Sequence, residues 1–236
     1  PPASAMFFGL IICDPFSLAF RWLALGVTAI VVLLVMGSSE VSERVLGEYL
    51  GLLLLVAVGL MLMAEANHLL MAYVAMELVS LTGYVLVGLL DDARSAEASL
   101  KYLLFGALAS GVMLFGMSLL FGLTGTLAFP ELLRATSALD GTHTAALLVA
   151  VVLMLAGLAF KISMVPFHMW TPDAYEGAPI AVTALLSVGP KAAGLALLWR
   201  LTGVLMPAWP AVAPLLAALT MVTMTLGNLV SLVQTN

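Results

Sequence analysis

Long apolar runs separated by short polar turns make up most of the chain. Seven runs have about the length needed to cross a bilayer as a helix, roughly 17–25 predominantly apolar residues. They cover residues 16–37, 48–64, 68–90, 98–123, 144–168, 179–205 and 211–235. Residues 1–15 form a partly apolar lead-in, and residues 124–143 form the longest connector. The pattern predicts an all-α, polytopic membrane protein of about seven transmembrane helices with small loops.

Composition agrees with this class and argues against several functions. The 236 residues are 63% hydrophobic and 9% charged, whereas a soluble domain is about 45–50% apolar and about 25% charged. The net charge of −5 argues against nucleic acid as a partner. With a single cysteine and no glycine-rich nucleotide loop, we expect no redox cofactor and no metal in this chain. The chain begins with Pro1 and shows no signal peptide, so we expect a fragment of a longer protein.

Four charged side chains within the predicted spans are candidates for function, whereas Arg21, Glu48 and Arg200 lie towards span ends. Lys101, Lys161 and Lys191 are three of the eight basic residues, and Glu77 is the one acid of 13 near the middle of a span. A charge at the centre of a bilayer costs about 2.5–3.5 kcal/mol on insertion scales, and intramembrane charges are functional by default. They predict a protein that moves protons or ions. The alternative is that the charges pair and only hold helices together.

Small polar residues accompany two of these charges on their helix faces. Ser80 and Tyr84 follow Glu77 at i+3 and i+7, which places all three on one face. A second row repeats every four residues at Thr183, Ser187 and Lys191. Since the rest of each helix is apolar, both rows should face protein. A lysine suits a proton relay there, because burial disfavours its charge and a nearby carboxylate restores it.

Prolines lie close to two of the lysines. Pro166 follows Lys161 by five residues and leaves the carbonyl of Ile162 without its helical donor. Pro190 directly precedes Lys191. Broken transmembrane helices occur where the freed backbone is buried in protein or lines a hydrated cavity, and transporters place ion sites at them. We therefore predict a discontinuous helix near Lys161–Pro166.

Three further features each allow two interpretations. Lys101 lies near a helix start, where it could join a relay or extend to the membrane interface. His168 follows Lys161 by seven residues and could pass protons between lysines or only donate to backbone. Gly106 and Ser110 have a spacing that permits close helix contact, for function or for ordinary packing.

Several segments together resemble one family of membrane proteins. The segments are FKISMVPFHMWTPDAYEGAP (160–179), SVGPKAAG (187–194), EASLKYLLFGALASG (97–111), MELVSLTGY (76–84) and LGNLVSLVQTN (226–236). They are similar to the antiporter-like membrane subunits of proton-pumping NADH:quinone oxidoreductase, respiratory complex I, most of all the N type. The resemblance implies fourteen helices with two inverted five-helix repeats. Here it implies a lead-in and first helix at 1–47, a first repeat at 48–205 and a truncated second repeat at 206–236.

The resemblance also implies roles for residues and partners. Glu77 would pair with Lys161 of the broken helix, Lys191 would link two half-channels, and Lys101 and His168 match polar positions of the family that could join the relay. The chain would be a non-redox subunit in a bacterial plasma membrane, beside other membrane subunits of the complex. NADH, FMN, iron–sulfur clusters and quinone would belong to partner subunits. The competing functions are a subunit of a multi-subunit Na+/H+ antiporter and a structural spacer with unused charges.

Overall fold

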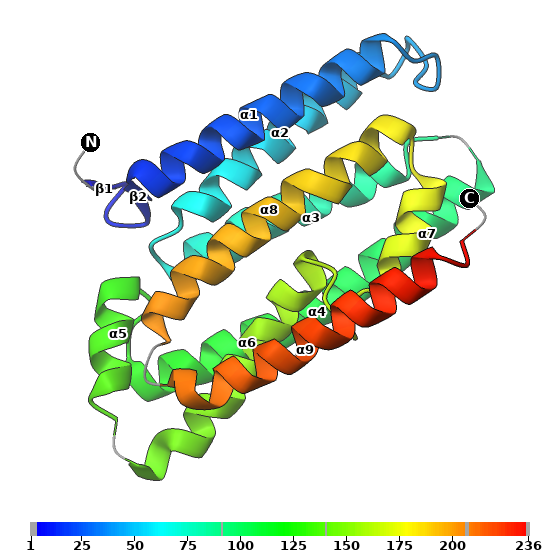
Figure 1. Ribbon diagram of the computed structural model, residues 1–236. Coiled ribbons are helices and arrows are strands. Elements are labelled where there is room, and N and C mark those ends of the chain that lie inside the picture. The colour runs from blue at the N-terminus through cyan, green and yellow to red at the C-terminus, as the bar shows by residue number, and fades with distance from the viewer. Residues whose placement is uncertain (1–3, 91, 140, 206–207, 235–236) are drawn as a thin grey trace.

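The protein is a bundle of long helices lying side by side (Figure 1). The computed structural model describes residues 4–90, 92–139, 141–205 and 208–234. Within these residues, seven helices are long and apolar enough to cross a membrane. They are α1 (Pro15–Met36), α2 (Leu46–Glu65), α3 (Leu69–Val87), α4 (Ala93–Thr124), α6 (Thr144–Lys161), α8 (Ile180–Val204) and α9 (Trp209–Ser231). The prediction of an all-α, multi-pass membrane protein with seven spans is confirmed.

Short elements occupy the lead-in and the connectors. Strands β1 (Ser4–Met6) and β2 (Ile11–Cys13) pair antiparallel. The amide of Asn67 donates to the carbonyl of Leu10 at 2.9 Å, so this hairpin closes over the turn between α2 and α3. Helix α5 (Phe129–Ser137) and the 3₁₀ turn η1 (Gly141–His143) fill the longest connector, and α7 (Trp170–Gly177) precedes α8. The hairpin and α5 were not predicted, and residues 1–3 of the lead-in and residue 235 of the seventh span lie outside the described part.

Local chemistry explains where several helices begin and end. Asp14 caps α1 and Asp92 caps α4, each by accepting a hydrogen bond at 2.7 Å from a backbone amide three residues later. His68 caps α3 through its Nδ1, which accepts from the amide of Leu70 at 3.2 Å. Helix α4 ends at Gly125, whose φ of +70° is the left-handed conformation that glycine adopts readily.

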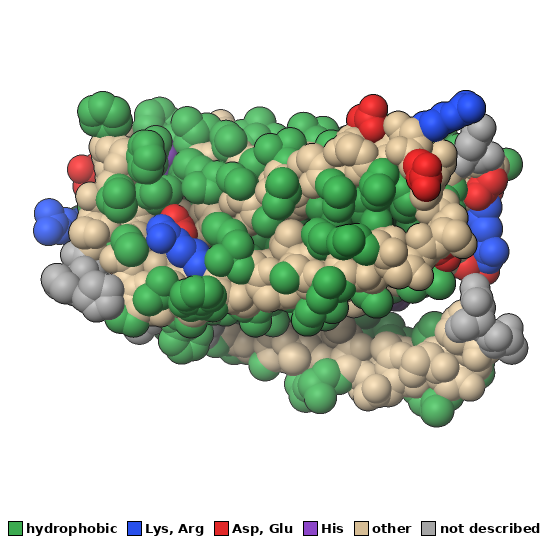
Figure 2. Space-filling model, turned by 90° about the horizontal axis from the view of Figure 1, so that it is seen from above, with side chains coloured by type: hydrophobic (Ala, Val, Ile, Leu, Met, Phe, Trp, Pro, Cys, Tyr) green, Lys and Arg blue, Asp and Glu red, His purple; other side chains and the backbone are tan. Residues whose placement is uncertain are grey.

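The core lies between the helices, and lipid-facing apolar side chains cover the outside. Helix α4 packs against α6 and α7, α2 against α3, and α8 against α1 and α2. Close packing is visible at Gly116 on α4, where an added Cβ would lie 2.6 Å from the amide nitrogen of Met154 on α6. Figure 2 shows broad apolar patches along the sides and charged side chains mostly towards the two ends. This distribution is the one expected of helices crossing a bilayer.

The fifth predicted span is broken in the structure. We expected residues 144–168 as one span, but α6 ends at Lys161 and the next helix begins at Trp170. Ser163 has a φ of +57°, and the amide of Val165 donates to Oγ1 of Thr223 on α9 at 3.0 Å. The predicted discontinuity near Lys161–Pro166 is therefore confirmed, and the predicted span was too long because the chain leaves the helix after Lys161, five residues before Pro166. The division into repeats stays a prediction.

Candidate functional site

Lys161 is buried where three helices meet. It is the last residue of α6, and only 1% of its surface is exposed. Its Nζ donates a hydrogen bond to Oγ of Ser80 on α3 at 3.0 Å. Ser80 in turn donates to the carbonyl of Met76, so its oxygen lone pairs face the lysine. The lysine stem lies against α8, where an added Cβ on Gly194 would be 3.6 Å from Cγ of Lys161.

Glu77 lies one turn before Ser80 on α3 and is half-buried. Its Oε1 accepts a hydrogen bond from Oγ of Ser110 on α4. Among the described side chains, Glu77 and Lys161 form no direct ion pair. The pairing that the resemblance implies stays a prediction; in this structure Ser80 contacts the lysine and Ser110 contacts the carboxylate.

The small residues of α4 fit against the polar row of α3. Ser110 meets Glu77, and one turn earlier Gly106 meets Tyr84. A Cβ on Gly106 would overlap the hydroxyl of Tyr84 and would lie 2.7 Å from its Cζ. The spacing that predicted close helix contact thus serves one seam, in which α4 accommodates Glu77 and Tyr84.

Lys191 borders a partly polar cavity between α7, α8 and α9. Its Nζ lies 5.0 Å above the ring centroid of Tyr175, a cation–π geometry. Thr183 donates to the carbonyl of Tyr175 at 2.9 Å, which ties the start of α8 to α7. The cavity has a volume of about 520 Å³, and its polar lining includes Lys191, His168, Tyr175, Thr183, Ser231 and Gln234. Of the predicted row, Thr183 and Lys191 line this cavity, and Ser187 lines a neighbouring one.

His168 lies in the loop between the two helix halves and faces the same cavity as Lys191. Its Nδ1 is buried and has no hydrogen-bond partner among the described residues. The structure therefore associates His168 with Lys191. The sequence allowed His168 either to pass protons or only to donate to backbone. Its Nδ1 makes no such backbone hydrogen bond within the described residues.

Lys101 lies at the edge of the bundle, in a group of charges that joins α4 to α7. Its side chain is 39% exposed, and its Nζ contacts Glu97 at 2.8 Å and Asp173 at 3.2 Å. Arg94 pairs with Glu176 beside it. We call these five residues the α4–α7 charge cluster. It lines a small cavity of about 200 Å³ and holds the second half of the broken helix against α4.

A second set of ion pairs lies at the opposite end and was not found from the sequence. Both terminal nitrogens of Arg200 contact the carboxylate of Asp14, at 2.9 and 3.1 Å, and Arg21 pairs with the buried Glu65. Burial raises the pKa of Asp14, but hydrogen bonds from Arg200 and Ser17 outweigh it and hold the pKa below its ordinary value. Because its charges are mutually paired, this set joins the start of α1 to α8 through Asp14–Arg200 and α1 to α2 through Arg21–Glu65.

Aromatic rings connect the two halves of the broken helix. Trp170 of α7 stacks on Tyr102 of α4 at 4.2 Å with an interplanar angle of 11°, and Tyr84 meets Tyr102 edge-on at 4.6 Å. The indole of Trp170 donates to the carbonyl of Phe160, next to Lys161, at 3.2 Å. These contacts position the lysine relative to α7. The contacting residues are 10 to 68 positions apart, so no local pattern predicted these pairs.

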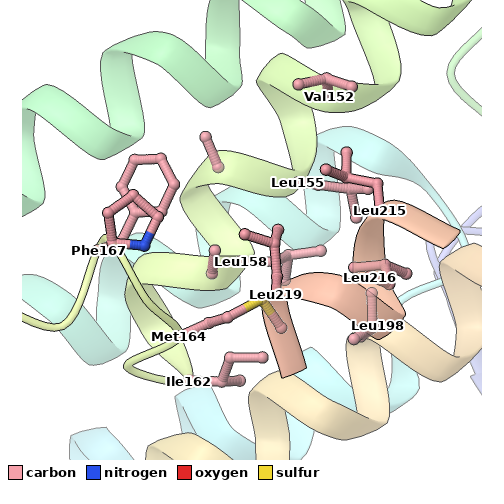
Figure 3. Close-up of a pocket in the computed structure, with 13 residues that line it drawn as sticks. Val152, Leu155, Leu158, Ile162, Met164, Phe167, Leu198, Leu215, Leu216 and Leu219 are labelled. Carbon is pink, nitrogen blue, oxygen red and sulfur yellow. The ribbon is translucent and has the colours of Figure 1, made fainter. Parts of the chain in front are cut away.

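The other side of the break is apolar. Figure 3 shows side chains from the break, α6, α8 and α9 around a cavity of about 140 Å³. Its lining includes Leu158, Ile162, Met164, Phe167, Leu198, Leu215, Leu216 and Leu219. Water needs polar partners, which this lining lacks. Among the described residues, no group of three or more His, Cys, Asp and Glu side chains could hold a metal ion.

Comparison with known proteins agrees with this architecture. Residues 66–236 match a family model described as NADH:quinone oxidoreductase/Mrp antiporter, TM. Subunit N of the NADH-quinone oxidoreductase of Anaeromyxobacter sp. (strain Fw109-5) is 45% identical over 100% of this chain and 50% of its own length. Subunit 2 of the NAD(P)H-quinone oxidoreductase of Thermosynechococcus vestitus is 44% identical over 100% and 45%. The chain therefore spans about half the length of these relatives.

Two solved assemblies contain chains of similar structure. A chain of respiratory complex I from Thermus thermophilus with bound Aureothin aligns with a TM-score of 0.81 and 35% identity, over 99% of this chain and 48% of that one. A chain of the Mrp complex from Dietzia sp. DQ12-45-1b aligns with a TM-score of 0.68 and 28% identity, over 81% and 35%.

Proposed function

Because the chain belongs to the family of NADH:quinone oxidoreductase/Mrp antiporter transmembrane subunits, we propose that it translocates protons in a redox-driven NADH:quinone oxidoreductase. It does so as a non-redox membrane subunit, next to other membrane subunits of the complex, in a bacterial plasma membrane. The relay consists of Glu77, Lys161 and Lys191, with His168 beside Lys191. NADH, FMN, iron–sulfur clusters and quinone are bound by the partner subunits.

The burial of Lys161 at the helix break carries this proposal. An ammonium taken out of water costs several kcal/mol unless a carboxylate and further hydrogen bonds compensate it. Here its direct partner is the neutral hydroxyl of Ser80. Glu77, which carries the nearest candidate carboxylate on α3, precedes Ser80 by one helical turn. The protonation of such a lysine depends on how near the carboxylate comes. A small movement of Glu77 or of the broken helix therefore loads or unloads a proton.

Contacts with α8 give the next step. The stem of Lys161 rests on Gly194, which is one turn from Lys191 on the same helix. From Lys161 a proton passes to Lys191, which borders the cavity that it shares with His168. Moving one charge against 100 mV costs about 2.3 kcal/mol. In the proposed function this chain carries no redox group. The energy for moving the charge therefore reaches it through its neighbouring subunits.

The second candidate is a Na+/H+ antiporter subunit, which the similarity to the Mrp assembly favours. The similarity to the complex I chain is higher in TM-score, 0.81 against 0.68, and in identity, 35% against 28%. The two functions differ in what drives the relay. Vesicles holding the assembled protein without NADH would show sodium-driven proton exchange only if the chain belongs to an antiporter.

Neutralising the lysines tests the proposal. Lys161→Met and Lys191→Met are introduced into the full-length subunit, and the assembled complex is followed by native gel, quinone reduction and proton uptake into vesicles. We expect normal assembly with lost or reduced proton uptake. Arg44→Met is the control, since Arg44 is an exposed cation in the loop between α1 and α2. Normal proton uptake in both lysine variants would mean that the charges only hold helices together. The chain would then be a structural spacer.

A further inference from the structure

Two tyrosines whose rings are in contact have buried hydroxyls without hydrogen-bond partners among the described residues. They are Tyr84 of α3 and Tyr102 of α4, which are 6% and 0% exposed. The two rings meet edge-on at 4.6 Å, and neither hydroxyl has a partner among the described residues. Buried polar groups are paired in the great majority of cases, and an unpaired one costs about 1–3 kcal/mol. Two such hydroxyls on tyrosines whose rings touch therefore need an explanation.

One end of this tyrosine pair reaches the Lys161 site. Tyr84 lies one turn beyond Ser80 on the polar face of α3, and Ser80 is the residue that Lys161 contacts at 3.0 Å. The hydroxyl of Tyr84 rests against Gly106, and a Cβ added there would also lie 3.2 Å from the ring of Phe160, the residue before Lys161. The hydroxyl thus lies close to the chain segment that carries the lysine.

The other end reaches the α4–α7 charge cluster. Tyr102 follows Lys101, whose partly exposed ammonium pairs with Asp173 at 3.2 Å. The ring of Tyr102 stacks on Trp170, which lies one turn before Asp173 on α7. Tyr102 therefore adjoins the solvent-open charge cluster along α4 and, through Trp170, on α7, while its hydroxyl lies at α3, 3.5 Å from a Cβ added to Gly83. Tyr84 adjoins the Lys161 site.

We propose that the hydroxyls of Tyr84 and Tyr102 conduct protons between the α4–α7 charge cluster and Lys161. The inference rests on the proposed function and adds the route that supplies its first lysine. A hydroxyl both donates and accepts. A proton from the cluster bonds to a tyrosine oxygen while that hydroxyl's own proton leaves towards the next acceptor. The neutral amine of Lys161 finally takes a proton, each tyrosine is unchanged, and water molecules bridge gaps too long for direct transfer.

One cavity beside the break is excluded as the route. The cavity of Figure 3, on the α9 side, is lined by apolar side chains and offers no group that could carry a proton. On the α3–α4 side the polar groups follow one another at about one helical turn, from Glu77 through Ser80 to Tyr84. If the hydroxyls conduct protons, their removal slows proton uptake. If they only fill space, their removal leaves proton uptake unchanged.

Removal of single oxygen atoms tests the inference. Tyr84→Phe, Tyr102→Phe and the double variant are made in the full-length subunit within its complex, and initial proton uptake into vesicles is measured at equal complex content. We expect at least a twofold loss in each single variant and a larger loss in the double variant. Tyr49→Phe is the matched control, because Tyr49 is 0% exposed, its hydroxyl is also unpartnered, and it belongs to α2, outside the route.

Stability and Lys161→Met make the outcomes distinct. Loss of an unpaired buried hydroxyl leaves stability equal or higher, so all three single variants should melt at or above the temperature of the unsubstituted complex. If Lys161→Met abolishes uptake and the double tyrosine variant pumps normally, this inference is wrong and the proposed function stands. If Lys161→Met itself pumps normally, the proposed function is wrong as well. If only one tyrosine variant assembles, its proton uptake is compared with that of Tyr49→Phe. Lower uptake supports the inference, and equal uptake contradicts it.

Discussion

A methyl group added at Gly106 should disrupt the seam between α3 and α4. The added Cβ would overlap the Tyr84 hydroxyl and lie 2.7 Å from Cζ of the same ring. Overpacking of this kind typically costs about 1–3 kcal/mol. In a helix, alanine is also favoured over glycine by about 0.8–1 kcal/mol. This gain offsets part of the cost, so the measured change in unfolding free energy is smaller than the cost of the clash.

Gly111, five residues later on α4, isolates the clash. It is exposed, and an added Cβ there would meet nothing within 4 Å. Gly111→Ala should gain the helix preference alone. The unfolding free energy of Gly106→Ala should therefore fall below that of Gly111→Ala by about 1–3 kcal/mol. The assay is denaturant unfolding of the full-length subunit in detergent.

Tyr84→Phe in the Gly106→Ala background completes the test. Removal of the hydroxyl relieves the overlap but leaves the ring carbon close, so the rescue should be partial, with a coupling energy of about 0.5–3 kcal/mol. Equal stability of Gly106→Ala and Gly111→Ala would refute the described seam. It would also remove the geometric basis for placing the Tyr84 hydroxyl beside the Lys161 site.

Two further substitutions have defined outcomes. Ser80→Ala leaves the buried Lys161 without its hydrogen-bond acceptor and should destabilise the subunit by about 1–3 kcal/mol; unchanged unfolding would show that the contact is unimportant. Asp14→Asn keeps the helix cap but removes the charge that faces Arg200. Since the folded pKa of Asp14 is lowered, its stabilisation is present above the unfolded value of about 3.9 and disappears as the pH falls through the folded value. Melting temperatures of the variant and the unsubstituted protein should therefore differ at pH 7 and converge below about pH 4; a constant difference would contradict this.

The spans and the break could be predicted because their signals are local. Apolar runs of membrane length identify helices without knowledge of their neighbours, and Pro166 marks the end of α6 from its own backbone chemistry. The end of the helix at Lys161 was missed by seven residues, since the segment up to His168 is apolar enough to continue a span. The hairpin at residues 4–13 and α5 are too short to show a clear period.

The site was predictable as a set of residues but not as a set of contacts. Depth and proline spacing singled out Lys161 and Lys191, and helical periodicity put Ser80 and Tyr84 beside Glu77. Which residues meet across helices depends on packing between distant segments. Lys161 and Ser80 are 81 positions apart, and Arg200 and Asp14 are 186 apart. Composition carries no record of such pairings, so the contact of Lys161 with a serine and the exposed partners of Lys101 emerged only from the structure.

The number of protons taken up per quinone reduced in the Lys161→Met complex tests the central claim most directly. It separates pumping from electron transfer and from assembly, which a native gel checks in the same preparation. The account predicts a lower ratio than in the unsubstituted complex and in the Arg44→Met control, with normal assembly. An unchanged ratio in a fully assembled Lys161→Met complex would contradict it, because protons would then cross without the buried lysine.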